Sequence, residues 1–181
     1  MFVPCKVPLG RRFNEVLPPS ARFTPASALA AAASSPRGRE GQVVAVVDLT
    51  KTKRYYSPEE LQDSGAQYIK VPCAGSDGAP SPLEVNTFCI AVLDVLRRWR
   101  PRQDKTPQQP VVLVHCTHGF NRTGAMLVHF AMRMTLLPHG PLLPNGWPDL
   151  PTALAEFAKA RAPGIYKEGY IAGPWPTLQP S

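Results

Sequence analysis

The fold of this chain is decided by residues 110–124, which read PVVLVHCTHGFNRTG. The apolar, mostly β-branched run at 111–114 is typical of a buried strand. The run stops just before Cys116, and Arg122 follows Cys116 after five intervening residues. The Thr-Gly pair that comes next opens an apolar stretch of helical character. The sequence therefore predicts a strand, a tight loop and a helix N-terminus in direct succession.

This order of elements gives the loop between Cys116 and Arg122 an anion-binding geometry. Backbone N–H groups of the loop and of the helix N-terminus converge on one point, where they favour negative charge. The same field favours the thiolate of Cys116, which makes the sulfur nucleophilic. Arg122 adds a planar fork that can hold two phosphoryl oxygens at once. We expect covalent phosphoryl transfer with Cys116 attacking phosphorus, the alternative being an inert cysteine beside a structural turn.

The string HCTHGFNRTG, residues 115–124, resembles the signature of the cysteine-dependent phosphatases. It is closely similar to one branch, the RNA 5′-triphosphatase domain of metazoan-type mRNA-capping enzymes and its RNA-phosphatase relatives. The resemblance implies that His115 orients the loop and supports the thiolate, and that Thr123 hydrogen-bonds the sulfur and helps it leave. Asn121 is implied to shape the loop. The residues implied to bind phosphate are Thr117, His118, Gly119, Phe120 and Asn121.

Length and composition indicate one metal-independent domain. A chain of 181 residues can bury one core, and we interpret the clusters of its 22 prolines as loops and tails. The net charge of +7 favours a polyanionic partner. The four cysteines and four histidines show neither metal-ligand nor disulfide spacing, so we expect no metal, no cofactor and a reducing compartment. No apolar run approaches the roughly 20 residues of a membrane span, so we expect no membrane partner.

A second cluster of polar residues follows the strand expected at 43–48. The string DLTKTKRYY, residues 48–56, gathers basic and aromatic side chains at the carboxyl end of that strand. This end is the ligand side of an open α/β sheet. The resemblance extends to this string, so Lys53 and Arg54 are candidates for RNA or phosphate contacts. The alternative is a solvated basic turn.

Two aspartates that precede the signature are candidates for a general acid or a loop anchor. Asp48 ends the first predicted strand, and Asp77 lies in the glycine-rich loop 73–80. The leaving group of a triphosphate is the β-phosphate, whose pKa of about 6 makes protonation worth little at neutral pH. We therefore hypothesise that neither aspartate is essential as an acid on triphosphate RNA.

Cap residues followed by proline mark the expected helix starts. His129 falls in the apolar helical stretch 125–136 and is interpreted as a core histidine. Helices are expected to begin at Pro25, Pro58, Pro82 and Leu150, and strands to cover 43–48, 68–71 and 111–114.

The tripeptide Trp147-Pro148-Asp149 resembles the general-acid loop of classical tyrosine phosphatases, but that loop precedes the cysteine and this one follows it. We therefore interpret Asp149 as the N-cap of the last long helix. That helix leads into ARAPGIYKEGY, residues 160–170, which is nearly identical to a segment of capping-enzyme phosphatase domains. Arg161 in this segment is a candidate to reach the phosphate loop.

The predicted order of strands and helices gives a single α/β domain with a mainly parallel central sheet flanked by helices. The resemblance, over roughly residues 10–172, implies the cysteine-phosphatase fold. We expect an N-terminal extension and linker at 1–42, partly packed on the core, a catalytic domain at 43–172 and a tail at 173–181. An organelle transit peptide is the alternative for the start, but GRRFNEVLPPSARFTP (10–25) resembles the segment before the phosphatase core in capping enzymes.

By this resemblance the substrate is the 5′-triphosphate end of nascent RNA in the nucleus. The γ-phosphate would leave through a cysteinyl-phosphate intermediate, as the first step of mRNA capping. The implied partners are a guanylyltransferase domain or subunit and the transcription machinery. The chain has no Lys-x-Asp-Gly string of a guanylyltransferase, so we expect a separate triphosphatase or the N-terminal part of a longer enzyme. The alternatives are a dual-specificity protein phosphatase, an RNA 5′-phosphatase outside capping, and a non-catalytic RNA- or partner-binding module.

Overall fold

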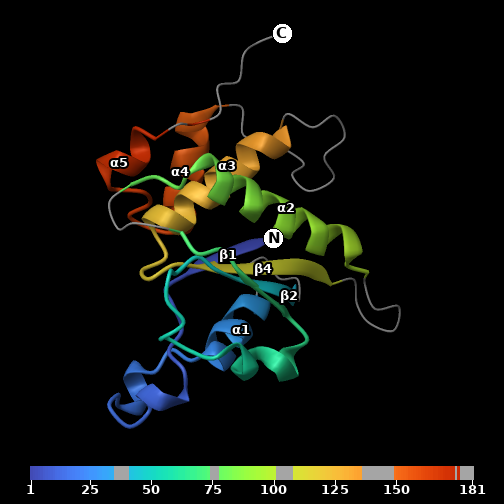
Figure 1. The fold of residues 1–181 in the computed structure, drawn as a ribbon, viewed down its shortest axis with the longest axis vertical. Helices are drawn as coiled ribbons and strands as arrows, with labels where there is room; N and C mark the ends of the chain where they lie inside the picture. The colour runs from blue at the N-terminus through green and yellow to red at the C-terminus, as the bar shows by residue number, and fades with distance from the viewer. Residues whose placement is uncertain (35–40, 74–77, 101–107, 136–148, 174, 176–181) are drawn as a thin grey trace.

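A parallel β-sheet forms the centre of the fold (Figure 1). The computed structural model describes residues 1–34, 41–73, 78–100, 108–135, 149–173 and 175. Within these residues the sheet has four strands in the order β1-β4-β2-β3, and all neighbouring strands are parallel. They are β1 (Phe2–Cys5), β2 (Gly41–Asp48), β3 (Gln67–Lys70) and β4 (Gln109–His115). The predicted fold class is confirmed.

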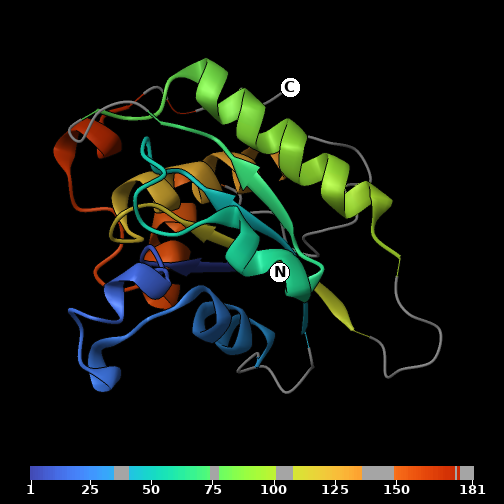
Figure 2. The ribbon, with the colours of Figure 1, turned by 60° about the horizontal axis from the view of Figure 1, so that its bottom comes forward.

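Helices cover both faces of this sheet. One face carries α2 (Pro82–Arg98), α3 (Asn121–Thr135), α4 (Leu150–Ala160) and α5 (Glu168–Ile171) (Figure 1). The other carries α1 (Pro25–Ala33) and the 3-10 helix Pro58–Ser64. Figure 2 shows the blue α1 on the side of the strands opposite the yellow-green α2. Two further short 3-10 helices, Arg11–Phe13 and Pro19–Ala21, precede α1.

The side chains of β4 supply both hydrophobic cores. Val112 and Val114 join the core that α2 and α3 cover, whereas Val111 and Leu113 join the core that α1 covers. Each of these side chains is at most 1% exposed. A strand that is buried on both faces needs no polar alternation, which explains why this run is continuously apolar in the sequence.

The predicted helix starts are confirmed, together with their caps. Thr24 and Ser27 cap the start of α1 reciprocally, and Ser81 and Glu84 do the same for α2. The Asp149 carboxylate accepts a hydrogen bond from the N–H of Thr152 at 2.7 Å, so it is the N-cap of α4. The Trp147-Pro148 pair that precedes it lies outside the described residues.

The strand β1 was not predicted from the sequence. It is four residues long, contains a proline and shows no alternation, so its pattern resembles a loop. Its partner β4 lies more than a hundred residues away in sequence. The ring of Phe2 packs edge-on against Phe130 of α3 at 5.0 Å, and Phe130 packs against Phe88 of α2 at 6.2 Å. The division of the chain into residues 1–42, 43–172 and 173–181 stays a prediction.

These contacts make the first residues part of the cooperative unit. We expect Phe2→Ala to lower the free energy of unfolding by about 2 kcal/mol, less than for a fully buried ring because Phe2 is half-buried. Urea unfolding measures the change. Val16→Ala is the control, because Val16 is 73% exposed and its truncation should change stability by less than about 0.5 kcal/mol. Superimposable curves for Phe2→Ala and the unmodified chain would contradict this assignment.

Candidate active site

The carboxyl ends of the strands form one row across the sheet. In register, Cys5 of β1 pairs with His115 of β4, His115 with Asp48 of β2, and Asp48 with Lys70 of β3. The loop at residues 116–122, which we call the signature loop, leaves β4 directly from this row. Helix α3 begins at Asn121, inside the loop. The predicted succession of strand, loop and helix is therefore present, and it ends on the predicted ligand side of the sheet.

Cys116 lies at the start of the signature loop with 6% of its surface exposed. The backbone N–H of Gly119 donates to its Sγ at 3.2 Å. This donor and the nearby N-terminus of α3 both favour negative charge, whether on the sulfur or on a bound anion. This geometry is compatible with the predicted role of Cys116 as a nucleophile, which stays a prediction.

Gly119 is the point where β1 approaches the signature loop. Its φ is +80°, in the left-handed region that favours glycine. A Cβ at this position would lie 2.2 Å from the carbonyl oxygen of Cys5. A second contact follows at once, because the N–H of Val7 donates to the carbonyl of Thr117 at 3.2 Å. The end of β1 and the signature loop therefore pack backbone against backbone, with no room for a side chain.

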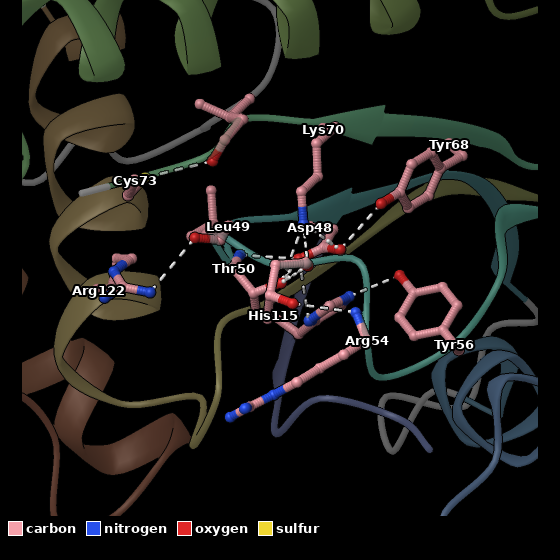
Figure 3. A network of polar contacts seen from close by, with 12 residues as sticks. Asp48, Leu49, Thr50, Arg54, Tyr56, Tyr68, Lys70, Cys73, His115 and Arg122 are labelled. Carbon is pink, nitrogen blue, oxygen red and sulfur yellow. Dashed lines mark hydrogen bonds and ion pairs between the residues drawn. The ribbon is translucent and has the colours of Figure 1, made fainter. Parts of the chain in front are cut away.

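Arg122 lies in the first turn of α3 and reaches the loop that follows β2. Its Nη1 donates to the carbonyl of Leu49 at 3.3 Å (Figure 3). The next residue, Thr123, is fully buried, and no hydrogen-bond partner for its Oγ1 is found among the described residues. The predicted contact between Thr123 and the sulfur stays a prediction.

The Asp48 carboxylate is the centre of a buried network of polar contacts (Figure 3). Thr50 donates to Oδ1 from its N–H at 2.8 Å and from its Oγ1 at 2.7 Å. Oδ2 accepts from the Tyr68 hydroxyl at 2.9 Å and from Lys70 Nζ at 2.8 Å. Burial works to raise the pKa of Asp48, but interactions with His115, Lys70 and Thr50 outweigh it and hold the pKa below its ordinary value.

This network favours the loop-anchor role for Asp48 over the acid role. A carboxylate that accepts these hydrogen bonds and keeps a low pKa is ionised at neutral pH and carries no proton to donate. The other candidate, Asp77, lies outside the described residues. Both roles toward a substrate stay predictions.

His115 is completely buried beneath the signature loop. Its Nε2 lies 2.7 Å from the hydroxyl oxygen of Tyr56, and its Nδ1 lies 3.9 Å from Asp48 Oδ1. Burial lowers the pKa of His115 to about 4, against the opposing effects of Asp48 and the Cys116 carbonyl. The imidazole is therefore neutral at physiological pH, which suits a residue that orients the loop through hydrogen bonds.

The segment that follows α4 lies against the outer side of the signature loop. Arg161 Nη2 donates to the carbonyl of His118 at 3.4 Å, and its guanidinium lies 4.7 Å from the centre of the Phe120 ring. Asn121 Oδ1 accepts hydrogen bonds from the N–H groups of Tyr166 at 2.9 Å and Lys167 at 3.0 Å. The structure thus brings Arg161 to the loop and gives Asn121 the role of tying the two segments together.

The other candidate phosphate-binding cations are exposed in the loop after β2. Lys53 and Arg54 both lie at the surface. The Arg54 guanidinium packs 5.2 Å from the ring centre of Tyr55 and donates to its hydroxyl. Neither cation forms a hydrogen bond or ion pair with the signature loop among the described residues, so their role stays a prediction.

Sequence reasoning did not assign roles to three tyrosines that the structure brings to this site. Tyr56 contacts His115, Tyr68 contacts Asp48, and Tyr166 contacts the signature loop. The pair at 55–56 belongs to the polar cluster that follows β2, but nothing in the local sequence indicates that Tyr56 points inward. These partners are distant in sequence, so only the fold reveals them.

The described residues contain neither a cluster of metal-binding side chains nor a helix that could span a membrane. No group of three or more histidine, cysteine, aspartate or glutamate side chains gathers there as a metal site would require. Each helix in the described part of the chain is too short or too polar to cross a lipid bilayer.

The chain is similar to proteins of two kinds. It is 33% identical to an mRNA-capping enzyme of Danio rerio and 31% identical to one of Mus musculus, each over 94% of this chain and 25% of the relative. It is 32% identical to the RNA/RNP complex-1-interacting phosphatase homolog of Caenorhabditis elegans, over 71% of this chain and 52% of the relative. The chain thus spans about a quarter of the capping enzymes that it matches. No protein-family model matches it.

Solved structures with similar folds are phosphatases. Tk-PTP in its active form has a TM-score of 0.56 with 20% identity, over 94% of this chain and 84% of that chain. PTPMT1 has a TM-score of 0.53 with 13% identity, over 94% and 90%. At these identities the likeness concerns the fold alone.

The Asp48 network yields a stability prediction. We expect Asp48→Asn to lower the free energy of unfolding by about 3 kcal/mol at pH 7, because it removes the buried carboxylate that pairs with the partly buried Lys70 ammonium. Because the folded-state pKa of Asp48 is lowered, its contribution is present above the unfolded-state pKa of about 3.9 and is lost as the pH falls through the folded-state value.

Chemical unfolding at pH 7 and at decreasing pH measures this effect. Asp94→Asn is the matched control, since Asp94 forms an exposed ion pair with Arg98 and its loss should cost less than about 0.5 kcal/mol. Equal stabilities of the two variants at pH 7 would show that Asp48 does not hold the network together.

Proposed function

We propose that this chain removes the γ-phosphate from the 5′-triphosphate end of RNA. The premise is that the chain belongs to the cysteine-dependent phosphatases, in the branch of the mRNA-capping enzymes and the RNA/RNP complex-1-interacting phosphatases. One observation carries the proposal. A buried Cys116 accepts a loop N–H beside the N-terminus of α3, which also carries Arg122. These are the parts that covalent phosphoryl transfer needs.

In the first step Cys116 Sγ attacks the γ-phosphorus. A sulfur–phosphorus bond forms as the bond from the γ-phosphorus to the bridging oxygen breaks, and the RNA leaves with a 5′-diphosphate end. The equatorial oxygens carry the charge of the transition state, where backbone N–H groups of residues 117–121 and the Arg122 fork stabilise it. His115, Thr117, His118, Gly119, Phe120 and Asn121 keep the loop in shape around that charge.

In the second step water attacks the phosphocysteine. The sulfur–phosphorus bond breaks, the thiolate is regenerated and inorganic phosphate is released. We assign Thr123 to this step, because its hydroxyl lies buried next to Arg122 and can hydrogen-bond the departing sulfur. The neutral His115 acts on the geometry of the loop and not as a proton carrier.

This reaction requires little help from a general acid. The leaving β-phosphate has a pKa of about 6, so it departs near neutral pH without a proton. Asp48 is ionised and occupied by its hydrogen bonds. We therefore infer that hydrolysis of triphosphate RNA proceeds without an acid from Asp48, and we extend the same hypothesis to Asp77.

The chemistry of the product indicates where this reaction stands in the sequence of capping steps. A 5′-diphosphate end is the substrate for guanylyl transfer, so this step would precede the transfer in the nucleus. A guanylyltransferase domain or subunit and the transcription machinery are the proposed partners. The net charge of +7 suits a polyanionic substrate. A second candidate is an RNA 5′-phosphatase outside capping, which the similarity to the RNA/RNP complex-1-interacting phosphatases favours.

The nucleophile is tested by substitution. We expect Cys116→Ser to reduce phosphate release from γ-labelled triphosphate RNA below about one per cent, a loss above roughly 2.7 kcal/mol, because a serine oxygen is not ionised in this site. Arg122→Lys should be nearly as inactive, because a point charge cannot replace the two-oxygen fork. Cys89→Ser is the control, since Cys89 is a buried cysteine on α2. Activity of Cys116→Ser above that threshold would refute the mechanism.

Metal independence is tested by chelation. Because the proposed site stabilises charge with backbone N–H groups and Arg122, we expect the rate of phosphate release from triphosphate RNA to be unchanged in EDTA. The assay is run on the same preparation with EDTA and with added magnesium or manganese. Activity that appears only with a divalent cation would assign the protein to a different mechanistic class.

A further inference from the structure

Tyr166 is exposed to an unusual degree for an aromatic residue at this site. Its side chain is 53% exposed, which places it among the large apolar side chains at the surface. The ring lies beside that of Phe120 at 6.2 Å between centres, with 60° between the planes. Phe120 belongs to the signature loop, so Tyr166 stands at the rim of the proposed phosphate site. One exposed aromatic residue needs no explanation, but a pair that includes the loop itself does.

The position of Tyr166 is fixed by the loop that it adjoins. Its N–H donates to Asn121 Oδ1 at 2.9 Å, and the N–H of Lys167 donates to the same atom at 3.0 Å. Asn121 is also the first residue of α3. The backbone of Tyr166 is therefore held to the helix that presents Arg122, while its ring stays in solvent. A rigid backbone with an exposed ring is preorganised to stack against a flat group.

A cation also packs against the Phe120 ring. The Arg161 guanidinium lies 4.7 Å from the centre of the Phe120 ring and donates to the carbonyl of His118. The rim therefore presents two aromatic rings and one guanidinium next to each other. We call these residues, Tyr166, Phe120 and Arg161, the rim platform. Aromatic faces and guanidinium planes are the groups on which proteins stack single-stranded bases.

We propose that the rim platform binds the first nucleobase of the RNA, with Tyr166 as the stacking residue. This inference rests on the proposed function, since it places the γ-phosphate at Cys116. The β- and α-phosphates and the ribose separate that phosphate from the base, so the base lies at the rim and not in the anion site. Stacking accepts any base, and the Arg161 charge favours the neighbouring phosphates. The platform makes the enzyme select a nucleotide-bearing triphosphate over an inorganic one.

The test compares a triphosphate-ended oligoribonucleotide with inorganic triphosphate, which has no base to stack. The measured quantity is the ratio of kcat/KM on the RNA to kcat/KM on inorganic triphosphate. We expect Tyr166→Ala to lower this ratio about tenfold, because KM for the RNA rises. A change of about tenfold is within the range for loss of one base–aromatic stack. Tyr166→Phe keeps the ring and should restore the ratio to within about twofold.

Ile90→Ala is the matched control, because Ile90 is 68% exposed on α2 and its truncation should leave the ratio unchanged. An unchanged ratio in Tyr166→Ala would overturn the proposed role of the rim platform. Equal losses of kcat/KM on both substrates would leave the ratio unchanged and would have the same meaning. A ratio that falls equally in Tyr166→Phe would assign the effect to the hydroxyl and would also overturn it. If the unmodified chain releases no phosphate from triphosphate RNA, the proposed function itself fails, and this outcome is separate from the others.

Discussion

The polar network at the carboxyl ends of the strands depends on one buried charge, the carboxylate of Asp48. It receives hydrogen bonds from the turn after β2 through Thr50 and from β3 through Tyr68 and Lys70. A buried carboxylate without such partners would take up a proton, and Lys70 would lose its counter-charge. Because His115 packs beside this pair, the base of the signature loop rests directly against the polar network.

The signature loop is supported from opposite ends of the chain. The backbone of β1 packs against Gly119 on one side, and the segment after α4 contacts Asn121 and Phe120 on the other. Neither support comes from an element next to the loop in sequence. These external contacts hold the loop in one conformation, with several N–H groups directed at one point. A loop without them would lose conformational entropy each time it bound an anion, which would weaken binding.

Sequence patterns predicted those parts of the fold whose signals are local. The strand before Cys116, the tight loop between it and α3, and the helix starts at Pro25, Pro82 and Leu150 all follow from spacing and caps within a few residues. The strand β1 was missed because a short segment with a proline shows no periodicity, and its pairing is decided by a partner far along the chain. The contact of Tyr56 with His115 joins residues 59 positions apart. Asp48 could be recognised as important, but only its neighbours distinguish an anchor from an acid.

The strand order β1-β4-β2-β3 has a consequence for synthesis on the ribosome. Within the described sheet, β4 is the last strand to be made, and it separates β1 from β2. Until it emerges, β1 has no pairing partner within the described sheet, and one edge of β2 is unpaired. Long-range parallel pairing of this kind is slow and leaves strand edges unprotected in the meantime. Since the signature loop follows β4 directly, it cannot take its place at the edge of the sheet before that strand is inserted, and its contacts with Arg161, Tyr166 and Lys167 form only after those residues are also made.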